Sequence, residues 1–172
     1  YSPGGACNVA ANLASLGVGS VERFGVVGPD PFSQALTRAV ERSGAVPRFL
    51  VQETEWHTST YTKLYEHEEE DRRIDFGGFN RLAPDTLERF LAGIASALPG
   101  CRLLIINQQL HHGVHTPEFR RRLVEATAAH PALPVLTDSR DYPAEYAGTI
   151  RKLNDREAAR CCGRDESEVP LT

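Results

Sequence analysis

The first residues able to take part in chemistry lie in the segment Gly4-Gly5-Ala6-Cys7-Asn8. Glycine lets a backbone approach a ligand closely, because it has no side chain to stand in the way. A helix is predicted to follow at once, with Val9, Leu13 and Leu16 as its apolar face. The unpaired N–H groups of a helix start point toward the same space. Gly4, Gly5 and Asn8 are therefore candidate ligand-binding residues.

Further polar residues come directly after predicted strands. Asn107-Gln108-Gln109 follow the apolar run 103–106, and Asp138 ends the run 134–137. Ligands of parallel α/β sheets bind beyond the carboxyl ends of the strands. Amide groups can donate to and accept from hydroxyl groups, so Asn107 and Gln108 are candidate substrate contacts. Ordinary contact of a strand end with solvent explains the same residues equally well.

The pair Asn154 and Glu157 has two interpretations. The spacing Asn-x-x-Glu is that of a capping box, in which each side chain satisfies a backbone N–H of the other residue at a helix start. The same carboxylate and amide can help to hold a hydrated magnesium ion that bridges phosphate oxygens. The two roles are compatible, and Glu157 would then reach the metal through water.

A β-hairpin is predicted at about residues 57–79, where the pattern of the chain changes. Residues 59–66 are β-prone and alternate in polarity, residues 66–71 form an acidic turn, and residues 72–76 return as a second strand. One face of such a hairpin is polar, as in a flap over a site. Lys63 and Arg73 on it are candidates for binding an anion, or they simply solvate an exposed face.

The remaining pattern alternates strands and helices. Strands are predicted at 21–27, 46–51, 103–106, 134–137 and 149–153. A helix begins at Pro31 with Asp30 as its cap and ends at Gly44, and others begin near Pro84, Pro117 and Asn154. Short connections between these elements favour an α/β fold with a mostly parallel sheet and helices on both faces.

Composition excludes several classes of protein. The 172 residues carry a net charge of −4, which disfavours nucleic acid as a partner, and no apolar run is long enough to span a membrane. The four cysteines, Cys7, Cys101, Cys161 and Cys162, have neither a zinc nor a disulfide spacing, which favours a cytoplasmic protein with reduced thiols. The chain has no methionine and starts with Tyr1, so we expect it to be a piece of a longer protein.

Three segments in this order resemble the ribokinase/PfkB family of sugar kinases. They are the Gly4-Gly5 segment, the hairpin and Asn154-x-x-Glu157. Within the hairpin, Thr60-Tyr61-Thr62-Lys63-Leu64 and Arg73-Ile74-Asp75-Phe76 are similar to strings of the heptose-phosphate kinase branch. The resemblance covers residues 4–159. It implies a ribokinase-like three-layer sandwich with a hairpin lid, incomplete at both ends, and an ATP-dependent kinase that uses Mg²⁺.

The resemblance also implies roles for individual residues. Gly4 and Gly5 would form the hinge between core and lid, Asn8 would contact the sugar, and the hairpin would close over it with Lys63 and Arg73 near a sugar phosphate. Asp138, followed closely by the basic Arg140, would belong with Asn154 and Glu157 to the phosphate- and magnesium-linked part of the site.

The chain departs from the family pattern in several places. Leu153 replaces a common proline, Ser139 replaces another, and Asn107-Gln108-Gln109 stand where heptose kinases tend to have Ser-Asp-Tyr. The glycine-rich Gly-Ala-Gly-Asp segment, which supplies the anion hole and the catalytic base, does not occur. We therefore expect no catalytic base in this chain and no turnover by it alone.

Two other classes of protein compete with the kinase interpretation. A non-catalytic relative would use the hairpin as a binding or homodimer interface, anchored by Tyr61, Tyr65 and Phe76. A Rossmann oxidoreductase would need a glycine fingerprint that is not present. A metal site at His111-His112-Gly113-Val114-His115 is less simple than a histidine-containing loop.

Overall fold

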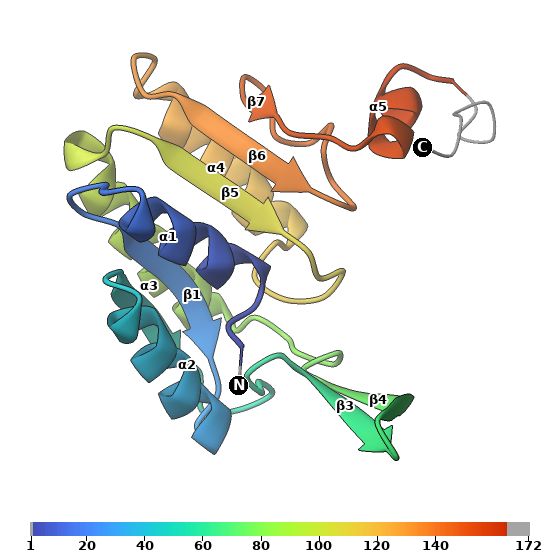
Figure 1. Ribbon diagram of the computed structural model, residues 1–172. Coiled ribbons are helices and arrows are strands. Elements are labelled where there is room, and N and C mark those ends of the chain that lie inside the picture. Colours follow the sequence, from blue (N-terminus) through green and yellow to red (C-terminus); the bar gives the residue numbers. More distant parts are fainter. Residues whose placement is uncertain (1, 165–172) are drawn as a thin grey trace. The chain divides into compact units, whose positions relative to one another are not determined.

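The computed structural model describes residues 2–164 (Figure 1). Contacts divide the chain into two compact units. The first comprises the residues up to Phe90 together with His112–Thr116, and the second comprises Leu91–His111 and the residues from Pro117 on. Strands and helices alternate along both units, as the sequence predicts.

The first unit is built on two parallel strands. Helix α1 (Gly5–Ser15) leads to β1 (Glu22–Val27), and α2 (Pro31–Arg42) leads to β2 (Val46–Val51). Strands β1 and β2 pair from Glu22↔Val46 to Val27↔Val51. The small buried cluster between helices and sheet is made of side chains from α1, from α2 and from the start of β2: Cys7, Ala10, Val40 and Ala45, with Val21, Leu36 and Phe49 against them.

The apolar face predicted for α1 is partly wrong. Cys7 and Ala10 are its buried residues, while Leu16 caps the helix and keeps 81% of its surface exposed. Small residues on the buried face let α1 lie close to its neighbours. At Gly44, for example, an added Cβ would already lie 3.6 Å from the Ala14 Cβ, an ordinary van der Waals distance.

The predicted ends of α2 are confirmed. Asp30 precedes Pro31, and its Oδ1 accepts a hydrogen bond of 3.0 Å from the Ser33 N–H. The helix gives way to Gly44 at φ +84°, a left-handed conformation that glycine adopts without strain. Both ends of α2 were therefore predictable from residue types alone.

The hairpin consists of β3 (Thr60–Glu66) and β4 (Glu69–Phe76), paired antiparallel. The six-residue acidic turn that the sequence predicted is wrong in length, because β4 already begins at Glu69. Only His67 and Glu68 make the turn, and both have positive φ, at 50° and 69°. Two such residues in succession form the tight hairpin turn whose twist matches that of the strands.

The second unit holds a three-stranded parallel sheet in the order β5-β6-β7. Its strands are β5 (Leu104–Gln108), β6 (Val135–Ser139) and the two-residue β7 (Ile150–Arg151), shorter than predicted. Helix α4 (Pro117–Ala128) connects β5 to β6 and runs behind both strands, and α5 (Asp155–Cys161) follows β7 (Figure 1). Helix α3 (Pro84–Ala97), with a 3-10 turn at Leu98–Gly100, precedes β5.

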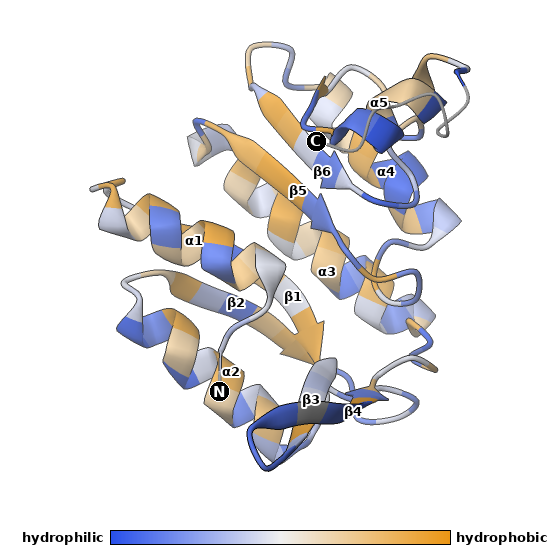
Figure 2. Cartoon of the chain, turned by 45° about the vertical axis from the view of Figure 1, so that its right-hand side comes forward, coloured by the Kyte–Doolittle hydropathy of each residue, from blue (hydrophilic) through white to orange (hydrophobic). Residues whose placement is uncertain are grey.

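Hydropathy separates the hairpin from the parallel strands. Figure 2 shows the hairpin largely hydrophilic, whereas β5 is hydrophobic along most of its length and hydrophilic at its end. In the described residues the parallel strands form a two-stranded and a three-stranded sheet, where the sequence predicted one. Among residues 2–164, no helix combines the length and the apolar character needed to cross a membrane.

Candidate functional site

Three polar side chains meet where β5 and β6 end, and we call Asn107, Asp138 and Lys152 the polar edge. Asn107 and Asp138 are register partners, and the Asn107 amide donates to Asp138 Oδ2 at 3.4 Å. The Lys152 ammonium lies 3.4 Å from both Asp138 oxygens, and its backbone N–H donates to the Thr137 carbonyl at 2.9 Å. The structure thus brings an amide, a carboxylate and an ammonium together at a strand end.

Strand alternation decides which residues reach this edge. Burial along β6 alternates, so Thr137 and Ser139 are almost fully enclosed while Asp138 is half-buried. Gln108 is paired with Ser139 and is likewise fully enclosed. Because neighbouring residues of a strand point to opposite faces, Asn107 and Gln108 cannot both face a ligand there. We therefore give Gln108 a structural role and do not carry it into the proposed site.

Asn154 and Glu157 form the predicted capping box at the start of α5. The Glu157 N–H donates to Asn154 Oδ1, and the Asn154 N–H donates to Glu157 Oε2, both at 2.8 Å. Glu157 is 7% exposed. Asn154, the cap of α5, is two residues beyond Lys152, so the capping box directly follows the polar edge in the sequence.

A protein-only metal cage does not occur among residues 2–164, where no three His, Cys, Asp or Glu side chains are grouped as metal ligands. Magnesium generally keeps several waters and binds through one or two carboxylates together with substrate phosphates. Asp138 and Glu157 are two carboxylates in this part of the second unit that could bind a magnesium ion in that way.

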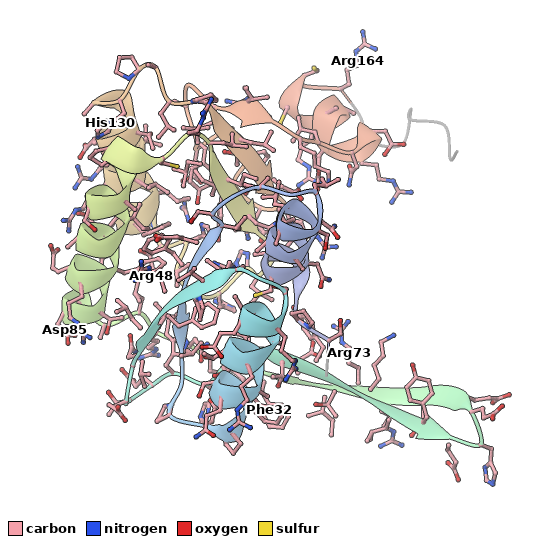
Figure 3. The ribbon with its side chains drawn as sticks, turned by 60° about the vertical axis from the view of Figure 1, so that its left-hand side comes forward. Phe32, Arg48, Arg73, Asp85, His130 and Arg164 are labelled. Carbon is pink, nitrogen blue, oxygen red and sulfur yellow. The ribbon has the colours of Figure 1, made fainter. Side chains whose placement is uncertain are left out.

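Lys63 and Arg73 come together on the hairpin, where they are cross-strand partners. Arg73 pairs with Asp75 at 2.8 Å, and its guanidinium lies 4.8 Å from the centre of the Tyr61 ring. Two cations directly opposite each other repel, so this face favours an anion that would lie between them. Figure 3 shows Arg73 on the hairpin and Phe32 at the start of α2.

On the opposite face of the hairpin, the last residue of β4 contacts the start of α2. Phe76 pairs with Thr60 and therefore lies on the face away from Tyr61, and its ring centroid is 6.1 Å from that of Phe32. The predicted set of Tyr61, Tyr65 and Phe76 as one apolar face is thus wrong, because register and packing remove Phe76 from it.

Hydrogen bonds hold the base of the hairpin. Asp30 Oδ2 accepts from the Thr58 N–H at 2.8 Å, and the Thr58 hydroxyl accepts from the Gly28 N–H at 3.0 Å. The Asn80 side chain exchanges two bonds of 2.8 Å with the His57 backbone, which closes the hairpin. Partial burial alone would raise the pKa of Asp30, but the hydrogen bonds from Thr58, Ser33 and Phe32 outweigh it and hold the pKa below its usual value.

Gly4 is the N-cap of α1, has extended backbone and receives no side-chain cap. A Cβ at Gly4 would meet no atom within 4 Å, so the packing of the chain itself does not require glycine there. Asn8 is exposed one turn into α1. In Figure 1, α1 begins at the end of the first unit where β1 ends and the hairpin leaves.

The predicted residues therefore form two groups in different units. Gly4, Gly5, Asn8 and the hairpin belong to the first unit, and the polar edge and capping box belong to the second. Their convergence on one cleft stays a prediction. Lys152 was missed by the sequence analysis, although a signal was available: Lys63 and Lys152 are the only lysines among 172 residues.

Comparison with known structures defines the class of fold. The chain matches a variant of phosphofructokinase-2 from Escherichia coli with a TM-score of 0.72 at 20% identity, over 95% of this chain and 53% of that one. It matches an uncharacterized sugar kinase from Pyrococcus horikoshii, solved in complex with ATP, with a TM-score of 0.57 at 17% identity, over 86% and 46%. The fold is that of the ribokinase-like α/β proteins.

Sequence comparison identifies the family. Residues 1–109 match the pfkB family of carbohydrate kinases, and the chain belongs to this family. It is 41% identical to the bifunctional protein HldE of Shewanella amazonensis over 98% of this chain and 34% of that protein. The chain thus spans about a third of the length of the curated relatives it matches.

Proposed function

We propose that this chain is part of a cytoplasmic, ATP-dependent sugar kinase whose substrate is a sugar phosphate of the heptose-phosphate type. Family membership supports phosphoryl transfer to a sugar hydroxyl. In this proposal the first unit, with Gly4, Gly5, Asn8 and the hairpin, binds the sugar. The second unit, with Asn107, the rest of the polar edge and the capping box, binds the phosphates of ATP.

The observation that carries the proposal is the arrangement of Asp138 and Lys152 beside the capping box. An ammonium is a point charge suited to a phosphate oxygen, and its partner Asp138 is less exposed, at 23% against 62% for Lys152. The partly buried carboxylate of Asp138 thus holds the Lys152 ammonium in place, and the ammonium remains accessible to a ligand.

The carboxylates of Asp138 and Glu157 suit a hydrated Mg²⁺, with Asn154 holding Glu157 in place. When bound, Mg²⁺ neutralises charge that develops on the transferred phosphoryl group. The residues of this chain would orient it through water.

Lys63 and Arg73 support an anionic sugar. Their direct pairing across the hairpin places two positive charges on one face. Asp75 offsets part of that charge, and Arg is well suited to phosphate through its planar guanidinium.

We propose that this chain alone has no turnover, because the Gly-Ala-Gly-Asp segment that supplies the base in the family does not occur in its sequence. Sugar-dependent formation of ADP by the chain alone would overturn this part of the proposal.

The two lysines allow both halves to be tested in one experiment. The chain is treated with an amine-acetylating reagent in the presence of MgATP, heptose phosphate or neither, and acetylation of Lys63 and Lys152 is measured by mass spectrometry. We expect MgATP to protect Lys152 and the sugar phosphate to protect Lys63. Each lysine serves as the control for the other.

Calorimetric titration supplies the matching affinities. Lys152→Ala should weaken MgATP binding about tenfold or more, and Lys63→Ala should leave MgATP binding unchanged but weaken sugar-phosphate binding. If neither ligand binds the unsubstituted chain, or if ribose binds as well as heptose phosphate, the proposal is wrong in its site or in its substrate class respectively.

A second candidate is that the hairpin mediates a homodimer. Its support is the exposure of Tyr61, Leu64 and Tyr65, at 55%, 42% and 61%. Aromatic residues are enriched at such interfaces. Sedimentation equilibrium of the chain and of Tyr65→Glu tests this candidate: a dimer that dissociates in the variant supports it, and a monomer at all concentrations overturns it.

A further inference from the structure

We propose that Gln108 is a positioning residue, which locks the segment 139–142 onto the end of β5 and so fixes the backbone that carries Asp138 and Arg140 at the phosphate-binding edge. This inference rests on the proposed function for its consequence in binding, but the lock itself is a separate claim. The residue was singled out in the sequence as a ligand contact, and the structure points to a different use.

The carboxamide of Gln108 has its hydrogen-bonding capacity used on both sides. Its Oε1 accepts from the Ser139 hydroxyl at 2.8 Å and from the Asp141 N–H at 2.9 Å. Its Nε2 donates to the Leu110 carbonyl at 2.8 Å and to Asp141 Oδ2 at 2.6 Å. The residue is 0% exposed, so these four hydrogen bonds are shielded from solvent.

The backbone of the same strand end adds to the lock. The Gln108 carbonyl accepts from the Arg140 N–H at 3.1 Å, and the Ser139 hydroxyl accepts from the Tyr142 N–H at 3.1 Å. Three successive N–H groups, those of Arg140, Asp141 and Tyr142, are therefore held directly or through Ser139 by Gln108. The turn after β6 has its conformation set by a residue of β5.

The segment is held from its other side by α4. The Arg120 guanidinium lies 3.7 Å from the centre of the Tyr142 ring and donates to Glu145 at 2.6 Å. The Tyr142 hydroxyl donates to the His111 carbonyl at 3.2 Å. Because contacts from β5 and from α4 both hold the segment 139–142, the bonds of Gln108 help to keep it in one position.

The position matters because of where the segment begins. Asp138 directly precedes the segment and is half-buried, and Arg140 lies within the segment and is exposed. A buried polar network whose groups are all hydrogen-bonded favours a single arrangement, since each buried group left without a hydrogen bond costs about 1–3 kcal/mol. A glutamine can satisfy two donors and two acceptors at once, which a carboxylate at position 108 could not do.

Amide hydrogen exchange of residues 140–142 tests the lock without any ligand. We expect Gln108→Leu to raise their exchange rates about tenfold or more, as loss of a bond worth about 1.4 kcal/mol would. The matched control is Thr127→Val, which removes a buried hydroxyl bonded to the Val124 carbonyl in α4. The control should leave residues 140–142 unchanged. Unchanged exchange in Gln108→Leu would overturn the lock.

Swapping the amide and the carboxylate between positions 108 and 141 provides a second test if Gln108→Leu unfolds the unit. Gln108→Glu places a carboxylate against that of Asp141, and Asp141→Asn replaces the charged acceptor with a neutral amide that has only one accepting oxygen, so each should accelerate exchange. In the double variant the amide at position 141 can donate to the carboxylate at position 108, which reverses the direction of the original bond. The double variant should therefore protect the amides of residues 140–142 from exchange better than either single variant does. Additive losses would overturn the lock.

Binding of MgATP to the full chain decides the positioning role. We expect Gln108→Leu to weaken binding about tenfold and the double variant to recover part of it, with Thr127→Val unchanged. Faster exchange without any change in affinity would reduce Gln108 to a purely structural residue and overturn the positioning role. If the unsubstituted chain binds no MgATP, the proposed function fails, and the exchange data still decide for or against the lock.

Discussion

The hairpin and the polar edge hold their charged residues in different ways. On the hairpin, Arg73 and Asp75 form an exposed pair, at 55% and 39% exposure, and the strands carry the side chains without a buried layer of their own. At the polar edge, Asp138 lies one residue from the fully buried Ser139, which Gln108 bonds. The hairpin can therefore adapt to a ligand, whereas the edge is formed before one arrives.

The difference shows where rigidity comes from in each region. Exposed ion pairs contribute little because water screens them. The hairpin consequently depends on its base, where Asp30, Thr58 and Asn80 make buried or half-buried hydrogen bonds. The edge depends on the layer directly beneath it. Substitutions in the buried layers should outweigh those on the exposed faces.

The largest effect is expected at Arg120. Arg120→Met removes a guanidinium that is 7% exposed, together with its bond to Glu145 and its contact with Tyr142, and should lower the free energy of unfolding by about 2–3 kcal/mol. Urea unfolding measures the change. Arg121→Met is the control, because Arg121 makes exposed surface pairs with Glu118 and Glu125 on the same helix. Equal losses in both variants would contradict the contrast between buried and exposed charges.

The next effect is expected at the base of the hairpin. Gly77 has φ +84°, and a Cβ there would lie 2.7 Å from the Ser59 Oγ, so Gly77→Ala should cost about 2 kcal/mol. Gly78→Ala is the control, because no atom lies within 4 Å of its Cβ position. Fluorescence of Trp56, which is buried and donates to the Val26 carbonyl, follows the unfolding. Equal losses of stability in the two variants would mean that the base does not restrain the hairpin.

A smaller, pH-dependent effect is expected at Asp30. Its folded pKa lies below the model-compound value of 3.8, so ionisation favours the folded state. That contribution is complete above the unfolded pKa and is lost as the pH falls through the lower, folded pKa. Asp30→Asn keeps one of the two accepting oxygens, loses the other, and should cost about 1 kcal/mol at pH 7, because the group is partly solvent-screened. The difference between the two unfolding midpoints should shrink as the pH falls below the usual pKa of an aspartate, and a constant difference would contradict this.

The smallest effect is expected at the turn of the hairpin. His67 and Glu68 adopt positive φ without being Asn or Gly, so His67→Asn with Glu68→Gly should stabilise the hairpin by about 0.5–1 kcal/mol. Hydrogen exchange across β3 and β4 measures the gain. Glu69→Gly, one residue further and inside β4, should instead speed exchange. Slower exchange in that control would show that the turn geometry is not the cause.

Local patterns were sufficient for some parts of the site. The cap at Asp30, the box at Asn154 and Glu157, and the hairpin all depend on residues close in sequence, and the structure contains each of them. The pairing of Lys63 with Arg73 was not predicted, since it needs the turn to be two residues long.

The errors arose where residues distant in sequence decide the outcome. Asn107 and Gln108 were placed after a strand because the apolar run ends at Ile106, but pairing with β6 extends the strand through both. Alternation then sends them to opposite faces. Lys152 escaped notice for the same reason, because its carboxylate partner Asp138 is 14 residues away.

The sequence by itself determined the order of the elements, the ends of α2 and α5, and the family, because caps, turns and short motifs act over a few residues. Only the tertiary structure decided that Lys152 faces Asp138, that Lys63 faces Arg73, and that Gln108 points inward. These outcomes depend on strand register, and register is set by packing between segments that no local pattern connects.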